Sequence, residues 1–221
     1  MSLTSLPYAF LIRKGTFLPV SSGHQGVEGD SLAQRYEYIR VLDRITDEHS
    51  LFLGATGYCG RELHQLIEGP NKFYMMGSMG CLASVGLGLA KENPGKRIYA
   101  LDGDGALLMK MGTMSTVGYH APENLVHICF DNGEYESTGG QSTVSANVDF
   151  HQIASACGYT RSIKTQDKED LLRYLDSDSE ELTFFYIPIK SGVKKDLPRP
   201  KVSPPDVASR FMSHISQLNN D

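Results

Sequence analysis

From residue 30 onward the apolar positions of the chain follow two alternating patterns. Short apolar runs, typical of buried strands, alternate with stretches in which apolar residues recur every three or four positions, as in helices. Strands are predicted at 51–55, 73–76, 97–101, 124–130, 160–163 and 182–187. Helices are predicted at 30–48, 58–67, 80–91, 106–118, 149–157, 168–175 and 205–218. This alternation predicts an α/β fold: a doubly wound, mostly parallel six-stranded sheet with helices on both faces.

The same pattern divides the chain into three parts. Residues 1–29 lack sustained periodicity and are predicted to be a linker or N-terminal extension, in which Met1-Ser2-Leu3 has the character of a cloning scar. Residues 30–192 form the predicted α/β domain. Residues 193–221 form an extended, proline-rich tail that ends in a short helix.

Composition narrows the class of protein. The net charge of -5 argues against general nucleic-acid binding, which needs concentrated positive charge. No apolar run approaches membrane-spanning length and no signal-peptide pattern is visible. The four cysteines are widely spaced within apolar patterns, so we expect buried free thiols and a cytoplasmic protein: Cys59, Cys81, Cys129 and Cys157.

The first candidate for chemistry is the triplet Gly103-Asp104-Gly105, between the strand at 97–101 and the helix at 106–118. A strand, a tight turn and a helix start direct backbone N–H groups at an anion, usually a phosphate. Asp104 would repel that anion unless a divalent cation such as Mg2+ lay between them. The alternative is a capping aspartate in an ordinary turn.

A second candidate lies at the end of the strand at 124–130, where Asp131-Asn132 follows. Ligands of open α/β sheets bind at the carboxyl ends of the strands. We therefore expect the Asp104 carboxylate and the Asn132 amide oxygen to share one metal ion. The alternative for Asn132 is a plain turn residue at a strand end.

These motifs together resemble the cofactor signature of the thiamine diphosphate-dependent enzymes: Gly-Asp-Gly at 103–105 and, about 27 residues after Asp104, Asp131-Asn132. Asp131 stands where the signature has its first asparagine, and Asn132 keeps the ligand position. The likeness extends to 77–80, and the run 131–145 is similar to that of phosphonopyruvate and sulfopyruvate decarboxylases. Further similar segments are 7–10, 13–15, 55–57 and 61–63. The resemblance covers most of the chain but only the cofactor-binding half of such an enzyme.

The resemblance implies a pyrophosphate-binding domain that holds thiamine diphosphate and Mg2+. Its metal ligands would be Asp104, Asn132 and the backbone carbonyl of Glu134. Met79 would prop the cofactor into its bent shape, although an ordinary core methionine is the alternative. The implied cofactor-binding residues are Thr56, Gly77, Ser78, Met79, Gly103, Asp104, Gly105, Ala106, Asn132 and Tyr135.

The resemblance also implies partners. The substrate would be a 2-oxo acid, first of all phosphonopyruvate with sulfopyruvate as the alternative, and Arg61 or Lys110 are candidates to contact its charged head group. No motif supplies the activating glutamate, so the catalytic residue is expected on a pyrimidine-binding domain, in a homo-oligomer. Either the chain starts at a truncation point in the linker or it is a naturally separate subunit. A non-catalytic nucleotide- or Mg2+-binding domain, or a regulatory partner subunit, is the alternative from another class.

Several other residues have weaker signals. The polar residues Ser137, Thr138 and Gln141 either order over the cofactor or belong to a surface loop. His127 lies on a predicted buried strand and is expected to be structural. Gly86-Leu87-Gly88 resembles part of a dinucleotide fingerprint, but helix packing explains these small residues without an acidic partner.

Overall fold

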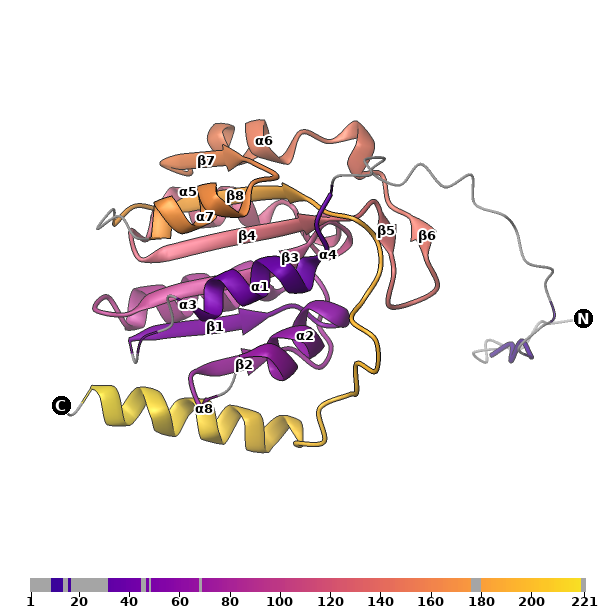
Figure 1. The fold of residues 1–221 in the computed structure, drawn as a ribbon, viewed down its shortest axis with the longest axis horizontal. Coiled ribbons are helices and arrows are strands. Elements are labelled where there is room, and N and C mark those ends of the chain that lie inside the picture. Colours follow the sequence, from indigo (N-terminus) through magenta and orange to yellow (C-terminus); the bar gives the residue numbers. More distant parts are fainter. Residues whose placement is uncertain are drawn as a thin grey trace, which may run out of the picture.

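The computed structural model describes residues 9–13, 16, 32–44, 47, 49–67, 69–175 and 180–219. Most of the predicted linker at 1–29 lies outside the described residues. The described residues from 32 onward form a central sheet covered by helices (Figure 1).

Six parallel strands form the main sheet, in the order β2-β1-β3-β4-β8-β7. They are β1 (Ser50–Gly54), β2 (Lys72–Tyr74), β3 (Arg97–Gly103), β4 (Leu125–Asp131), β7 (Arg161–Lys164) and β8 (Thr183–Pro188). Every residue of β1 and β4 is buried, as expected for central strands covered on both faces. The prediction of a doubly wound six-stranded sheet is confirmed.

Helices cover both faces of this sheet. One face carries α1 (Arg35–Asp43), α2 (Tyr58–Leu66) and α7 (Lys168–Leu175), and the other carries α3 (Leu82–Glu92), α5 (Thr113–His120) and α6 (Phe150–Ala156). Figure 1 shows α1, α2 and α7 in front and α3 and α5 behind. The last helix, α8 (Pro204–Leu218), packs along β2, where Phe211 meets Phe73 with 5.8 Å between ring centroids. None of the helices in the described segments is long and apolar enough to cross a membrane.

Three local predictions differ from the structure. The helix predicted at 106–118 is two helices, α4 (Asp104–Met109) and α5, because the chain leaves helical geometry at Lys110 before Gly112. The first helix is shorter than predicted, with Gln34 as its N-cap; the predicted cap, Asp30-Ser31, lies outside the described residues. The loop after Asp131-Asn132 contains the hairpin β5 (Glu134–Tyr135) and β6 (Gln141–Ser142), followed by a 3-10 turn, η1 (Ser145–Asn147).

The four cysteines are free, but only two of them are buried as predicted. Cys59 and Cys129 lie in the core, and burial raises the pKa of the Cys59 thiol to about 12. Cys81 and Cys157 are partly exposed because they lie at helix ends, before α3 and after α6.

The strand order places a ligand-binding crevice between β1 and β3. From β1 the chain runs outward to β2, whereas from β3 it runs to β4 on the opposite side. Connections that diverge in this way leave a crevice at the carboxyl ends of the two strands. Thr56 follows β1 at this point, and Asp104 follows β3.

Candidate active site

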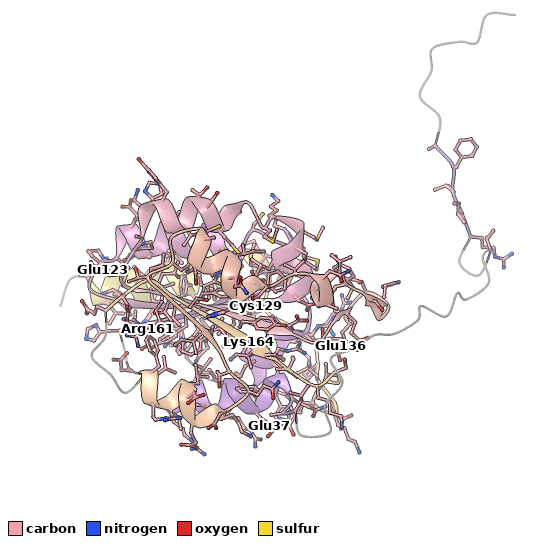
Figure 2. All side chains as sticks on the ribbon, turned by 90° about the horizontal axis from the view of Figure 1, so that it is seen from above. Glu37, Glu123, Cys129, Glu136, Arg161 and Lys164 are labelled. Atoms are coloured by element: carbon pink, nitrogen blue, oxygen red, sulfur yellow. The ribbon has the colours of Figure 1, made fainter. Side chains whose placement is uncertain are left out.

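A cavity of about 60 Å³ opens at the carboxyl ends of the central strands. It brings together most residues predicted from the sequence, from four separate segments. Lining it are Thr56, Met79, Gly103, Asp104, Gly105, Ala106, Asn132, Glu134 and Tyr135. Glu136 also lines the cavity. Figure 2 shows it at the opposite end of the molecule from Glu123, which lies near the start of β4.

Asp104 is the first residue of α4 and is only 2% exposed. The Thr143 hydroxyl donates a hydrogen bond of 2.6 Å to its Oδ2 atom. Burial, and then the nearby Asp131 carboxylate, raise the pKa of Asp104 to about 7, against the opposing effect of the Thr143 hydrogen bond. The site thus concentrates buried negative charge, which a bound cation would offset.

Asn132 follows β4 with its amide fixed in one orientation. Its Nδ2 donates to Glu136 Oε2 at 3.1 Å, and its Oδ1 accepts from the Glu134 backbone N–H at 3.2 Å. An amide oxygen has two lone pairs, so Oδ1 retains one for a metal ion.

Asp131 stands where the family's cofactor signature has an asparagine, and it holds the loop at 133–145 in place. Its Oδ1 accepts from the Gly133 N–H at 2.8 Å and from the Ser145 hydroxyl at 2.9 Å. Its Oδ2 accepts from the Tyr186 hydroxyl at 2.8 Å. These three hydrogen bonds occupy most of the acceptor positions of the Asp131 carboxylate, which explains why an aspartate is accommodated here.

A buried ionic network lies beside the predicted metal ligand Asn132 and was not predicted from the sequence. Arg35 of α1 donates through Nε to Glu62 of α2 at 2.8 Å and through a terminal nitrogen to Glu136 at 3.4 Å. Glu136 also accepts from the Gly192 N–H at 2.6 Å. Because Glu136 binds the Asn132 amide, the network connects α1, α2 and the C-terminal segment to the predicted ligand.

The loop at 77–80 enters the site only through Met79. Gly77, Ser78 and Gly80 have positive φ angles of 145°, 52° and 86°, so the chain follows an unusual path around this methionine. Met79 lines the cavity, whereas Gly77 and Ser78 are exposed and do not.

Gly105 is in close contact with Tyr135 in the cavity lining. A Cβ at Gly105 would lie 2.5 Å from the Tyr135 ring, so only glycine allows this close contact.

The other weak candidates separate in the structure. Ser137 lines the cavity, but Gln141 is exposed and does not. Lys110 is exposed and packs against Gly80, outside the cavity. His127 is fully buried in β4, where it contacts the Tyr159 hydroxyl at 3.0 Å, in agreement with a structural role.

Comparison with known proteins identifies the family. The profile described as "Thiamine pyrophosphate enzyme, C-terminal TPP binding domain" matches residues 55–187, more than half of the chain. The chain belongs to this family. The match runs from the residue after β1 almost to the end of β8 and includes the whole cavity apart from Arg35.

Individual relatives of this thiamine pyrophosphate-binding domain are decarboxylases. The chain is 38% identical to "Phosphonopyruvate decarboxylase" of Streptomyces viridochromogenes over 96% of its own length and 57% of the relative. It is 33% identical to "Sulfopyruvate decarboxylase subunit beta" of Methanothermobacter thermautotrophicus over 84% of its own length and 98% of that subunit. The chain thus spans about half the length of the phosphonopyruvate decarboxylases that it matches.

Solved structures agree on the fold. Benzoylformate decarboxylase from Polynucleobacter necessarius superimposes with a TM-score of 0.59 at 16% identity, over 73% of this chain and 34% of that one. At this identity the likeness establishes the fold of the thiamine pyrophosphate-binding domain and nothing further.

The residues present fit the cofactor of the family. The three predicted ligands Asp104, Asn132 and Glu134 all line the cavity, and a carboxylate, an amide and a backbone carbonyl are oxygen donors of the kind that Mg2+ prefers. Among the described residues, this cavity included, no three His, Cys, Asp or Glu side chains form a metal-binding group. The predicted ligand set, Asp104, Asn132 and the Glu134 carbonyl, contains just one carboxylate and therefore does not require such a group.

Proposed function

We propose that this chain is the cofactor-binding part of a thiamine diphosphate-dependent decarboxylase that converts 3-phosphonopyruvate to phosphonoacetaldehyde and CO2. The observation that carries the proposal is the cavity in which Asp104, Asn132 and Glu134 meet at the carboxyl ends of β3 and β4. The likeness to phosphonopyruvate decarboxylases at 38% and 43% identity supports the substrate.

Under this proposal the chain binds the diphosphate end of the cofactor. Asp104, Asn132 and the Glu134 carbonyl would hold Mg2+, and the backbone N–H groups of Gly105 and Ala106 would donate to the diphosphate. Met79, which lines the cavity, would support the bent cofactor.

When bound, thiamine diphosphate supplies the electron sink for decarboxylation of a 2-oxo acid. This chain would orient that group, while the glutamate that activates it would come from a pyrimidine-binding domain or subunit. We propose a homo-oligomer in which neighbouring chains complete the site. The four free thiols support a cytoplasmic location.

A second candidate is the beta subunit of a sulfopyruvate decarboxylase. The chain spans 98% of the Methanothermobacter subunit, so a polypeptide of this extent occurs as a separate subunit in a relative. Under this alternative the partner would be another polypeptide, and the substrate head group would be a sulfonate.

Turnover assays separate these candidates. The chain, mixed with a matched pyrimidine-binding domain and supplied with Mg2+ and thiamine diphosphate, is expected to decarboxylate phosphonopyruvate faster than sulfopyruvate. A preference for branched or aromatic 2-oxo acids would contradict both candidates. Binding of ATP or NAD in place of thiamine diphosphate would instead indicate a non-catalytic nucleotide-binding domain.

A further inference from the structure

A second, larger cavity adjoins the predicted cofactor site. It encloses about 430 Å³ at the carboxyl ends of β1 and β2 and shares Thr56, Met79 and Ser137 with the first cavity. A Cβ at Gly57 would lie 2.8 Å from the Ser137 hydroxyl, so Gly57 and Ser137 approach closely where the two cavities adjoin. A ligand here would lie directly beside Met79, next to the predicted cofactor position.

Two arginines line this cavity from distant parts of the sequence. Arg61 lies in the first turns of α2, with its guanidinium 5.1 Å from the centre of the Tyr58 ring. Arg199 belongs to the segment between β8 and α8. Within the described parts of the chain, neither arginine forms an ion pair with an acidic side chain. Both guanidinium groups therefore remain available to an anion.

The backbone around Arg199 is restricted on both sides. Arg199 lies between Pro198 and Pro200, whose rings restrict the backbone on both sides. The segment is attached upstream by the Lys194 N–H, which donates to Glu62 at 3.3 Å, and downstream by α8 packed on β2. Figure 1 shows it running from β8 down the carboxyl-end side of the sheet to α8. The fold thus brings Arg199 into the same cavity as Arg61 of α2.

The charge of this cavity contrasts with that of the whole chain. The protein carries a net charge of -5, yet among the described residues the lining of this cavity contains two arginines and no acidic side chain. A cationic cavity with two free guanidinium groups favours an anion with several oxygens, because each group can donate two parallel hydrogen bonds.

We propose that Arg61 and Arg199 bind the phosphonate head of the substrate and so determine its selection over simple 2-oxo acids. This inference rests on the proposed function, which places the reacting end of the substrate beside the cofactor and Met79. Two positive charges match a phosphonate dianion better than a sulfonate monoanion. Lys110, the other cation considered from the sequence, lies outside this cavity.

Binding measurements on single variants test the inference. Calorimetry gives the Kd of phosphonopyruvate, sulfopyruvate and pyruvate for the wild type, Arg61→Gln and Arg199→Gln, at a mildly alkaline pH that keeps the phosphonate doubly charged. Arg173→Gln is the matched control, since Arg173 is exposed on α7 and pairs with Asp170. We expect each cavity variant to weaken phosphonopyruvate binding about tenfold or more. The affinity for sulfopyruvate should fall less, and the affinity for pyruvate should be unchanged. The control variant should bind all three acids like the wild type.

The affinity for thiamine diphosphate with Mg2+, measured on the same variants, separates this inference from the proposed function. If the wild type binds the cofactor but the arginine variants bind phosphonopyruvate normally, the inference fails and the proposed function stands. Equal losses for pyruvate, or a loss of cofactor affinity alone, would also overturn it. If the wild type does not bind the cofactor, the proposed function fails and the inference fails with it.

Discussion

At the scale of single residues, the two buried aspartates of the site have different partners. Asp131 accepts hydrogen bonds from Gly133, Ser145 and Tyr186, which hold it as an anchor of the loop. Asp104 accepts hydrogen bonds from the Thr143 hydroxyl and the Gly105 backbone, lies against Asp131 and lines the cavity. Asp104 therefore retains the lone pairs that a metal ligand needs, whereas Asp131 fixes the loop that carries Asn132.

The proposed role of Glu134 resides in its backbone, and this leads to a prediction. Glu134→Gln removes the side-chain charge but keeps the carbonyl, so the Kd for thiamine diphosphate with Mg2+ should change by less than about threefold, less than the value of one hydrogen bond. Calorimetry on the variant measures this. A loss of cofactor affinity of tenfold or more would show that the Glu134 carboxylate itself binds the metal.

At the scale of elements, buried charges and close backbone contacts hold the site in place. Arg35 joins α1 to α2 through Glu62, and both side chains are almost fully buried, at 8% and 0% exposure. Removing one partner of a buried ion pair leaves the other charge without compensation. The network therefore stabilises the packing of α1 and α2 next to the metal-binding motif.

The network makes a stability prediction. Arg35→Met should lower the free energy of unfolding by about 3–5 kcal/mol, because Glu62 would remain charged and buried. Arg173→Met, which breaks an exposed pair with Asp170, should change it by about 1 kcal/mol or less. Urea denaturation of both variants makes the comparison. Recovery of much of the loss in Arg35→Met/Glu62→Leu is expected, and equal effects of the two single variants would contradict the argument.

Two helical glycines provide a second, opposed pair of predictions. A Cβ at Gly118 of α5 would lie 1.8 Å from the Cys157 carbonyl oxygen, whereas a Cβ at Gly88 of α3 would meet nothing within 4 Å. Gly118→Ala should therefore destabilise the protein by about 1–3 kcal/mol through overpacking. Gly88→Ala should stabilise it by about 0.4–1 kcal/mol, because alanine restricts the unfolded chain. Thermal unfolding distinguishes the two signs.

The extent to which the sequence predicted this fold depends on the range of the interactions. The β4 strand was predicted to within one residue because an unbroken apolar run is a local signal. The break between α4 and α5 was missed because Leu107, Met111 and Met114 keep helical spacing across Lys110 and Gly112. The hairpin of β5 and β6 has two residues in each strand, too few to show a period.

The site followed the same rule. Asp104 and Asn132 were predicted because each follows a strand that the apolar pattern marks, and the structure places both in one cavity. Arg35, Glu62 and Glu136 were missed because they are 27 to 101 positions apart and meet only in the folded chain. For Arg35 and Glu62 the available signal was a charged residue at a core-facing position of a predicted helix, whereas Glu136 lies in the loop after β5.

At the scale of the whole molecule, the chain spans 57% of the Streptomyces viridochromogenes phosphonopyruvate decarboxylase. The crevice of the six-stranded sheet carries the proposed diphosphate and metal site. Under the proposed function, the pyrimidine end of the cofactor would project toward a pyrimidine-binding domain or subunit. The protein's activity should depend on that partner.

This dependence is itself testable. The chain alone should show no decarboxylation of phosphonopyruvate above background, and addition of a matched pyrimidine-binding domain should restore turnover. Steady-state assays across partner concentrations measure the effect. Full activity of the isolated chain would show that the activating group lies within these residues.

The most direct test of the central claim is calorimetry of thiamine diphosphate with and without Mg2+. We expect binding to the wild type only when Mg2+ is present, and we expect Asp104→Asn to weaken it about tenfold to hundredfold, because a charged metal ligand is lost. Asp149→Asn, which alters an exposed cap of α6, should bind like the wild type. Binding that is independent of Mg2+, or unaffected by Asp104→Asn, would contradict the metal site on which the account depends.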